Sequence, residues 1–263
     1  MIGRMFSVAL IAALFTLSAE ARPLYLFGNI GPASVVALLE NDDGVLRGYY
    51  FYRIVGKELE LEGKIDASGA FMLDEKSGGA KTGRFVGAMK DGVWSGEWRK
   101  PDGGSPLAFS FAEPRSGGAA LDGSYRCSSI YRDAQYGWTY KTSLTLKVAK
   151  GAVKGFDAGL DEQSAQDGSQ GCFYNLKDFH QAETDIGLLL TAKDVDDPVT
   201  EDSQRCSIRV VGDDKTLFVE FGDLTAKNDD CRFSGTTAFC SPRSSMGNIV
   251  VDRAKGACKA LSD

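Results

Sequence analysis

The stretch that decides the fold runs from Val45 to Trp98 and has the sequence VLRGYYFYRIVGKELELEGKIDASGAFMLDEKSGGAKTGRFVGAMKDGVWSGEW. Apolar and polar residues alternate along it, and short turn signals interrupt the alternation. Because successive side chains of a β-strand point to opposite faces, this pattern predicts half-buried antiparallel strands. We therefore expect an all-β fold that begins with an antiparallel meander.

The first turn of this meander is predicted at Gly56-Lys57, a dipeptide that suits a two-residue II′ hairpin turn. Such a turn would place Ile54 opposite Leu59 on one face and Arg53 opposite Glu60 on the other. An apolar pair on one face and opposite charges on the other are typical of a half-buried antiparallel ribbon.

The second turn is predicted at Asp66 to Gly69, where Asp begins a type I turn and Gly takes the left-handed conformation. This turn would place Ile65 opposite Phe71. A third turn is predicted at Asp91-Gly92, because a type I′ turn needs positive φ at both central residues.

The third turn would set Gly87 opposite Gly96, with Phe85 facing Trp98 beside them. Two opposed glycines leave a gap over which aromatic rings can lie, so we expect these aromatics to pack in a core. Arg84 to Gly103 resembles one unit of the MORN repeat, with its aromatic-x-Gly start and Gly-x-x-aromatic return. The resemblance implies a β-hairpin alone, since MORN proteins stack many copies and no second good copy follows.

Residues 1–21 have the pattern of a secretory signal peptide. Arg4 precedes an apolar run from Met5 to Leu17, and Ala19-Glu20-Ala21 matches a cleavage site. Arg22 follows where a lipidated protein would have Cys. We expect a periplasmic or secreted bacterial protein without a membrane span, since no later stretch approaches about 20 apolar residues.

Six cysteines all follow residue 120, which leaves the first part of the mature chain without any. In an oxidising compartment an even number favours disulfides over metal ligation or catalysis. The predicted disulfide cysteines, whose pairing the sequence leaves open, are Cys127, Cys172, Cys206, Cys231, Cys240 and Cys258. A Cys231–Cys240 pair would close a short rigid loop for binding a partner, or simply a stapled hairpin.

Composition predicts two β domains joined by a linker. The predicted parts are a signal peptide (1–21), a cysteine-free antiparallel β-meander domain (22–112), a linker (113–120) and a disulfide-stabilised antiparallel β domain (121–263). Both β domains are expected to be meander- or barrel-like. In the second domain, alternation predicts strands at 140–148, 152–156, 207–211 and 216–221. Polar composition predicts loops at 160–171 and 194–204, and Phe179 to Thr184 is predicted as a short helical turn.

Charge indicates the kind of partner. The chain has a net charge of −6, and from Leu121 onward 22 Asp and Glu outnumber 17 Lys and Arg. The sequence lacks the basic footprint of a nucleic-acid-binding protein, so we expect an exported, cationic protein partner. The candidate partner-binding residues are Asp196, Asp197, Asp229, Asp230 and Arg243.

Catalytic and cofactor motifs do not occur in the sequence. His180 is the one histidine, without a G-x-S-x-G or H-E-x-x-H motif, and is expected to be solvated. Glu58, Glu60 and Glu62 alternate on one strand face and are expected to solubilise it rather than to hydrolyse glycosides. The acidic segment 194–202 departs from the calcium-loop pattern at Pro198, which favours a solvated loop. We therefore expect neither catalytic residues nor a cofactor or metal.

These features favour an exported, non-enzymatic binding protein, of the inhibitor or immunity type, that acts on a cell-wall enzyme or toxin. Its general character is similar to that of periplasmic lysozyme inhibitors, although their Ser-Gly-x-x-Tyr loop is not found. One alternative is a calycin-like carrier of a small apolar ligand. Another is a glycan-binding module with a stacking surface made of Trp94, Trp98, Trp138, Tyr49 and Tyr136.

Overall fold

The structure is a computed structural model that describes residues 23–114, 118–133, 138–164, 168–175, 179–192, 207–221 and 248–260. Its regular structure is β-strand apart from the 3-10 turn η1 (Gly118–Leu121) in the described part of the chain. The predicted all-β fold is confirmed. The predicted signal peptide lies outside the described residues, and so do residues 115–117 of the predicted linker.

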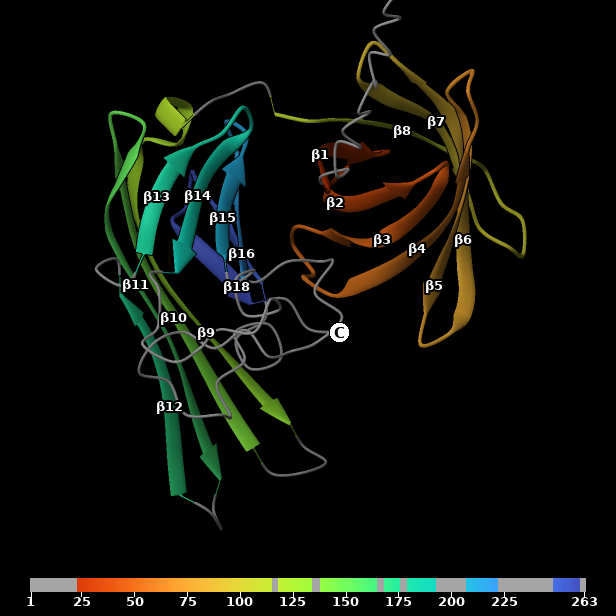
Figure 1. The fold of residues 1–263 in the computed structure, drawn as a ribbon. Helices are drawn as coiled ribbons and strands as arrows, with labels where there is room; N and C mark the ends of the chain where they lie inside the picture. Colours follow the sequence, from red (N-terminus) through yellow and green to blue (C-terminus); the bar gives the residue numbers. More distant parts are fainter. Residues whose placement is uncertain are drawn as a thin grey trace, which may run out of the picture.

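The first eight strands form a closed antiparallel barrel in which each strand pairs with the next and β8 returns to β1 (Figure 1). The strands are β1 (Leu24–Ile30), β2 (Ala33–Asp42), β3 (Val45–Tyr52), β4 (Glu58–Ile65), β5 (Ala70–Ser77), β6 (Ala80–Lys90), β7 (Val93–Arg99) and β8 (Leu107–Ala112).

Two further sheets follow the barrel. The four-stranded sheet has the order β12-β11-β10-β9 and consists of β9 (Gly123–Asp133), β10 (Trp138–Ala149), β11 (Ala152–Ser164) and β12 (Gly168–Asn175). The six-stranded sheet is a meander of β13 (Phe179–Glu183), β14 (Gly187–Ala192), β15 (Ser207–Gly212), β16 (Thr216–Phe221), β17 (Ile249–Asp252) and β18 (Ala257–Ala260).

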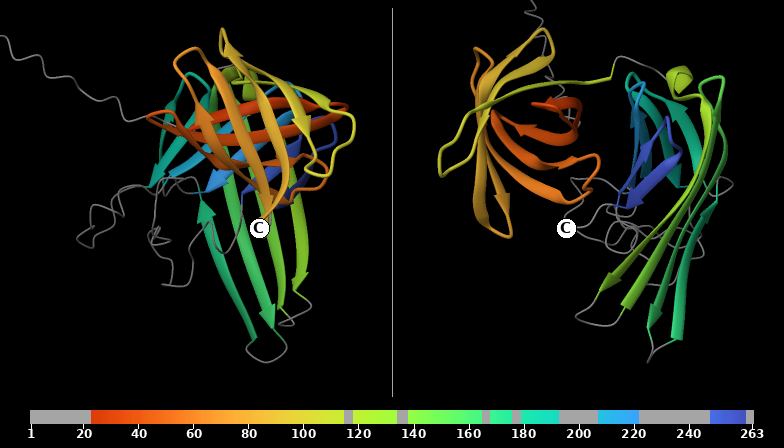
Figure 2. Two further views of the ribbon diagram at one scale, coloured as in Figure 1. Left: turned by 90° about the vertical axis from the view of Figure 1, so that its right-hand side faces the viewer. Right: turned by 180° about the vertical axis from the view of Figure 1, so that it is seen from behind.

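The six-stranded sheet is a middle layer between the barrel and the four-stranded sheet (Figures 1 and 2). Every residue of β16 is buried. Leu217 and Val219 belong to the core shared with β9 to β11, whereas Phe218 packs on the outer wall of the barrel. Strand alternation places these residues on opposite faces of β16, so the sheet is apolar on both sides.

The barrel contributes the outward-facing side chains of β1 to β3 to this interface. The Phe218 ring lies 5.5 Å from that of Phe51 and 6.5 Å from that of Tyr25, between ring centroids. The interface cluster comprises Tyr25, Phe27, Val36, Leu38, Tyr49 and Phe51 of the barrel with Ile186, Val211, Phe218 and Val250 of the middle sheet. Burial of this apolar surface holds the barrel and the middle sheet together.

Buried polar groups are paired across the same interface. The Tyr25 hydroxyl donates a hydrogen bond to Glu220, and the Asn248 side-chain amide donates one to the Tyr49 hydroxyl at 2.6 Å. Burial, and then the neighbouring Glu220 carboxylate, raise the pKa of Tyr25 far above its ordinary value. Arg209 approaches Glu220 to 4.0 Å. The Tyr25–Glu220 and Asn248–Tyr49 hydrogen bonds would both be lost if the barrel separated from the middle sheet.

The barrel interior is filled with aromatic rings, as the opposed glycines predicted. Gly87 lies opposite Gly96, and a Cβ atom at Gly87 would come within 3.1 Å of the Phe109 ring. The Phe109 ring packs against Phe85 at 5.2 Å and Phe71 at 6.0 Å between centroids. The predicted pairs at the second and third turns are also found, and Asp91-Gly92 has positive φ at both residues.

The predicted register at the first turn is wrong. Strand β3 ends at Tyr52 and β4 begins at Glu58, so a five-residue loop replaces the two-residue turn. Leu59 lies opposite Tyr50 rather than Ile54. Because the register moves by an even number of residues, each side chain of β3 and β4 stays on the face that was predicted for it. Ile54 and Arg53 lie outside the β3–β4 ladder, and the Arg53 side chain contacts the middle sheet.

Two predictions in the second half are also corrected. Residues 160–171 are mostly strand, because β11 and β12 pair along a long hairpin up to Ser164 and Gly168. Phe179 to Glu183 is strand β13 rather than a helical turn, because its residues pair with β14. The predicted strands at 140–148, 152–156, 207–211 and 216–221 are confirmed as β10, β11, β15 and β16. The predicted loop at 194–204 lies outside the described residues.

One predicted disulfide is described, and it joins the two sheets. Cys127 on β9 bonds Cys258 on β18, with Cα atoms 5.4 Å apart. Cys206, Cys231 and Cys240 lie outside the described residues. The pairing of the remaining cysteines stays a prediction.

The Phe218 side chain, which packs between the middle sheet and the barrel, provides a test of the layered arrangement. Replacing Phe218 with Ala should lower the free energy of unfolding by about 3–5 kcal/mol, because it leaves a cavity between two layers. Ile130→Ala is the control, since Ile130 is 61% exposed and should change stability by less than about 0.5 kcal/mol. Urea denaturation measures both, and a loss below about 1 kcal/mol for Phe218→Ala would contradict this role for the interface.

Candidate functional site

An exposed apolar pair lies on the loop between β3 and β4, which we call the β3–β4 loop (residues 53–57). Ile54 is 87% exposed and Val55 is 53% exposed. The loop is a tight turn, because the backbone N–H groups of Val55 and Gly56 both donate to the Tyr52 carbonyl at 2.9 Å. Gly56 has φ of 70°, a conformation that glycine adopts without strain.

The middle sheet holds this loop from two sides. Arg53 Nη1 donates to Thr216 Oγ1 at 3.0 Å, and Lys259 Nζ lies 3.5 Å from the Ile54 carbonyl oxygen. A Cβ atom at Gly56 would lie only 2.7 Å from Lys259 Cδ, so the lysine stem lies directly over the glycine. The contacts of Arg53 and Lys259 thus hold the loop on both sides of Ile54 and Val55, which we call its tip. The side chains of the tip face solvent.

The charge around the tip is mostly basic. Arg53 and Lys57 belong to the loop, Lys259 lies against it, and Glu58 follows at the start of β4. Arg53 and Lys259 both bind neutral oxygen atoms here. Their positive charges therefore flank an apolar tip, on a chain whose net charge is −6.

A second candidate is Glu75, a carboxyl group inside the barrel that is only 3% exposed. The Tyr50 hydroxyl and Trp98 Nε1 each donate to its Oε2 atom at 2.7 Å, and the Thr82 hydroxyl donates to Oε1 at 2.6 Å. Burial, and then the adjacent Glu75, raise the pKa of Tyr50 far above its ordinary value. Three strands are thus joined to β5 through one side chain.

The space around Glu75 is occupied by the chain itself. A Cβ atom at Gly83 would lie 2.5 Å from Trp98 Nε1 and 2.9 Å from Glu75 Oε2. Even a methyl group lacks room there, so the carboxyl group serves as an internal hydrogen-bond acceptor. We therefore assign Glu75 a structural role in the barrel.

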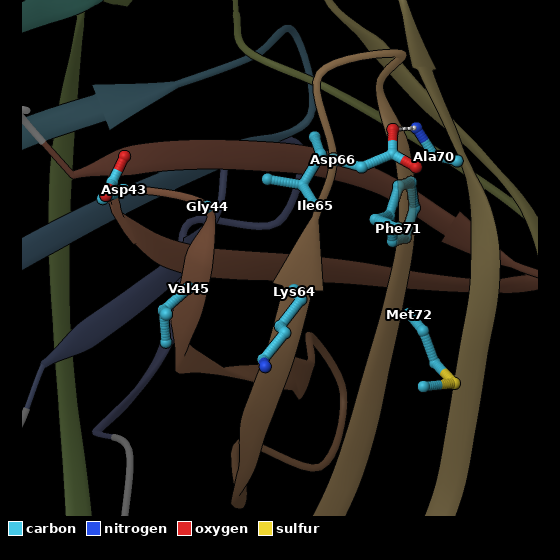
Figure 3. Close-up of a pocket in the computed structure, with 9 residues that line it drawn as sticks. All are labelled: Asp43, Gly44, Val45, Lys64, Ile65, Asp66, Ala70, Phe71 and Met72. Carbon is cyan, nitrogen blue, oxygen red and sulfur yellow. Dashed lines mark hydrogen bonds between the residues drawn. The ribbon is translucent and has the colours of Figure 1, made fainter.

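A third candidate is an open hollow of about 520 Å³ beside the β2–β3 and β4–β5 turns (Figure 3). Its lining residues are Asp43, Gly44, Val45, Lys64, Ile65, Asp66, Ala70, Phe71 and Met72. The Asp66 carboxylate accepts hydrogen bonds from Ser68 and from the Ala70 N–H, and those bonds lower its pKa. Asp66 is thus occupied in its own turn, and Met72 gives the hollow an apolar side.

The predicted functional residues are dispersed. Trp94, Trp98 and Tyr49 are buried, the first two inside the barrel and the third at the interface, so they do not form a stacking surface for a glycan. The side chains of Tyr136 and Trp138 lie outside the description. The five predicted partner-binding residues, Asp196, Asp197, Asp229, Asp230 and Arg243, also lie outside the described residues.

The remaining ionisable candidates lie on the surface. His180 is exposed on β13, and Glu60 and Glu62 are exposed on the outer face of β4, where Glu62 pairs with Lys76 at 2.6 Å. Across the described ranges, acidic, cysteine and histidine side chains do not gather into a metal-binding group. Over the same ranges, the chain forms no helix of the length and apolarity that crossing a membrane requires.

Sequence reasoning missed the β3–β4 loop because it assigned Ile54 to a strand. The signal was present as two aliphatic residues directly before a glycine. Turns are usually polar, so an apolar pair at a turn indicates either a ladder position or a contact surface.

The Glu75 network can be tested by changing its acceptor. Glu75→Leu should lower the free energy of unfolding by about 2–6 kcal/mol, because Trp98 Nε1 would lose its acceptor in the barrel interior and the Tyr50 hydroxyl would keep only its 3.4 Å contact with the Tyr52 hydroxyl. Glu75→Gln, the matched control, keeps an acceptor oxygen and should cost less than half as much. Urea denaturation followed by tryptophan fluorescence measures both. Equal losses would show that hydrogen bonding does not account for the effect.

Asp74 on the barrel wall gives a pH-dependent prediction. Arg84 and Lys81 approach its carboxylate to 2.6 and 2.7 Å, and hydrogen bonding from Arg84 is the main cause that lowers the pKa of Asp74 to about 2. A lowered pKa stabilises the folded state above the ordinary value of 3.8, and this contribution disappears as pH falls toward 2. Asp74→Asn should therefore show a shallower loss of stability between those pH values. An unchanged slope in acid denaturation curves would contradict the assignment.

Comparison with protein-family models, with curated proteins and with solved structures returned no match to this chain.

Proposed function

We propose that this chain is an exported, non-enzymatic binding protein that uses the β3–β4 loop to anchor another exported protein. The observation that carries the proposal is the exposure of Ile54 and Val55 on a loop that the middle sheet holds in place. An apolar tip that already has its bound conformation loses little entropy on binding. Aliphatic side chains that enter a partner's pocket gain free energy from burial.

The shape of the loop indicates how the partner would be engaged. Its backbone folds back on Tyr52 through two hydrogen bonds, so it differs from the extended segment that a peptide-binding cleft accepts. A compact tip fits a concave apolar pocket instead. Such an anchor suits an inhibitor or immunity-type protein that blocks an enzyme or toxin by covering its surface.

Charge favours a partner whose pocket carries carboxylates at its rim. Arg53, Lys57 and Lys259 lie in or against the loop, and opposite charges at an interface speed association and suppress wrong partners. The expectation of a cationic partner rested on the net negative charge from Leu121 onward, and its candidate binding residues lie outside the described residues. For this loop we therefore propose an acidic partner.

The filled barrel interior favours a protein partner over the carrier alternative. Phe71, Phe85, Phe109 and Phe111 pack against one another in the barrel core. A carrier of a small apolar ligand needs an enclosed cavity in its barrel, and here the chain's own rings occupy the interior. Export is proposed from the signal-peptide pattern, and the Cys127–Cys258 disulfide is compatible with an oxidising compartment.

Site-specific photo-crosslinking tests this function. A photoreactive phenylalanine analogue at position 54 should link the protein to one exported partner in its native host. The same analogue at position 130 is the matched control, because Ile130 is also an exposed apolar residue, 61% exposed on β9. A crosslink at position 130 that equals the one at position 54, or none at 54, would overturn the proposal.

The captured partner then permits a quantitative test. After its purification, Ile54→Asp should weaken binding by about 30-fold or more, as expected for the loss of a central apolar anchor. Ile130→Asp should leave the affinity unchanged. Equal affinities for both variants would show that the β3–β4 loop is not the anchor.

A further inference from the structure

We infer that the Cys127–Cys258 disulfide controls how firmly the β3–β4 loop is held, so that reduction of this bond loosens the binding tip. The inference concerns regulation of the site and therefore rests on the proposed function. Its structural part, the link between disulfide and loop, is measurable without any partner. It follows from the position of two consecutive residues on β18.

Strand β18 (Ala257–Ala260) is short and lies at the end of the six-stranded sheet. In the described part of the chain its backbone ladder is with β17, where Cys258 pairs with Val251 and Lys259 with Val250. Its other neighbour, β9, belongs to the four-stranded sheet. The disulfide therefore joins β18 covalently to a strand with which it shares no ladder.

Alternation along β18 connects this bond to the loop. Consecutive residues of a strand point to opposite faces. Cys258 packs against the core between the two sheets, and the exposed Lys259 reaches the Ile54 carbonyl and covers Gly56. One side chain of the short strand is thus fixed by the disulfide, and the next one holds the tip.

Reduction would release this support. A dithiol reductant would transfer two electrons and two protons, the Cys127–Cys258 bond would break into two thiols, and the reductant would become a disulfide. Four residues of β18 would then depend on the β17 ladder and on packing. A short strand at the edge of a sheet opens locally at a low free-energy cost, and Lys259 would move with β18.

Limited trypsin digestion of the full chain reports directly on this link. Trypsin cuts after Arg53 and Lys57, and we expect slow cleavage at both sites while the loop is held. The double variant Cys127→Ser/Cys258→Ser should be cut there about tenfold faster or more than the native chain, because local opening governs cleavage. Cleavage at Lys90, at the β6–β7 turn of the same barrel, serves as the internal control and should stay unchanged.

Lys259→Ala separates the lysine contact from general loss of stability. It keeps the disulfide intact and should also accelerate cleavage at Arg53 and Lys57, whereas Lys255→Ala in the adjoining β17–β18 turn should not. Hydrogen exchange of residues 53–57 should rise in Lys259→Ala and in the double cysteine variant, but not in Lys255→Ala. Unchanged cleavage in the double variant, or an equal rise at Lys90, would overturn the inference.

The outcomes of the two proposals are distinguishable. If the loop loosens in the double variant but position 54 fails to crosslink, the structural link stands and the proposed function fails. If position 54 crosslinks but the cleavage rates stay unchanged, the loop is an anchor that the disulfide does not control.

Discussion

Burial of the middle sheet on both faces is the constraint on which the rest of this structure depends. Strand β16 has no exposed residue, since Val219 faces the inner core and Phe218 faces the barrel. A sheet that is apolar on both sides needs two covering layers, and the barrel wall is one of them. The barrel and the two sheets therefore form one layered body, and the buried Tyr25–Glu220 pair exists only within it.

The same interface shapes the candidate binding site. Arg53 reaches Thr216 on the middle sheet, and Lys259 reaches back to Ile54. The barrel supplies the apolar tip, and the middle sheet supplies the contacts that hold it. The turn itself is formed by hydrogen bonds within the barrel, and the contacts of Arg53 and Lys259 join it to the middle sheet.

Local rules predicted the parts of the fold that local geometry decides. Asp91-Gly92 and Gly69 adopt the positive φ values that their turns require, and Gly87 does face Gly96. These positions depend on neighbours only a few residues away. The all-β fold and several hairpins of the second half followed from the same reasoning.

Features that depend on distant segments were not predictable in this way. Ile54 leaves the ladder where Thr216 and Lys259, far along the chain, contact its loop. Glu220 is a single carboxylate between Val219 and Phe221, and the covering barrel makes it a buried acceptor. The support of the candidate site was missed for the same reason, because Thr216 and Lys259 reach it from distant parts of the chain.

Closure of the barrel also has a consequence for how the chain reaches this state. The ladder that pairs Phe27 with Ala112 joins β1 to β8, the first and last strands of the barrel. The disulfide bridges a separation of 131 residues. Contacts this distant form late and make folding slow. Until they form, β1 and β8 are two open edges that can pair with other chains, so the unfinished protein is the state most exposed to aggregation.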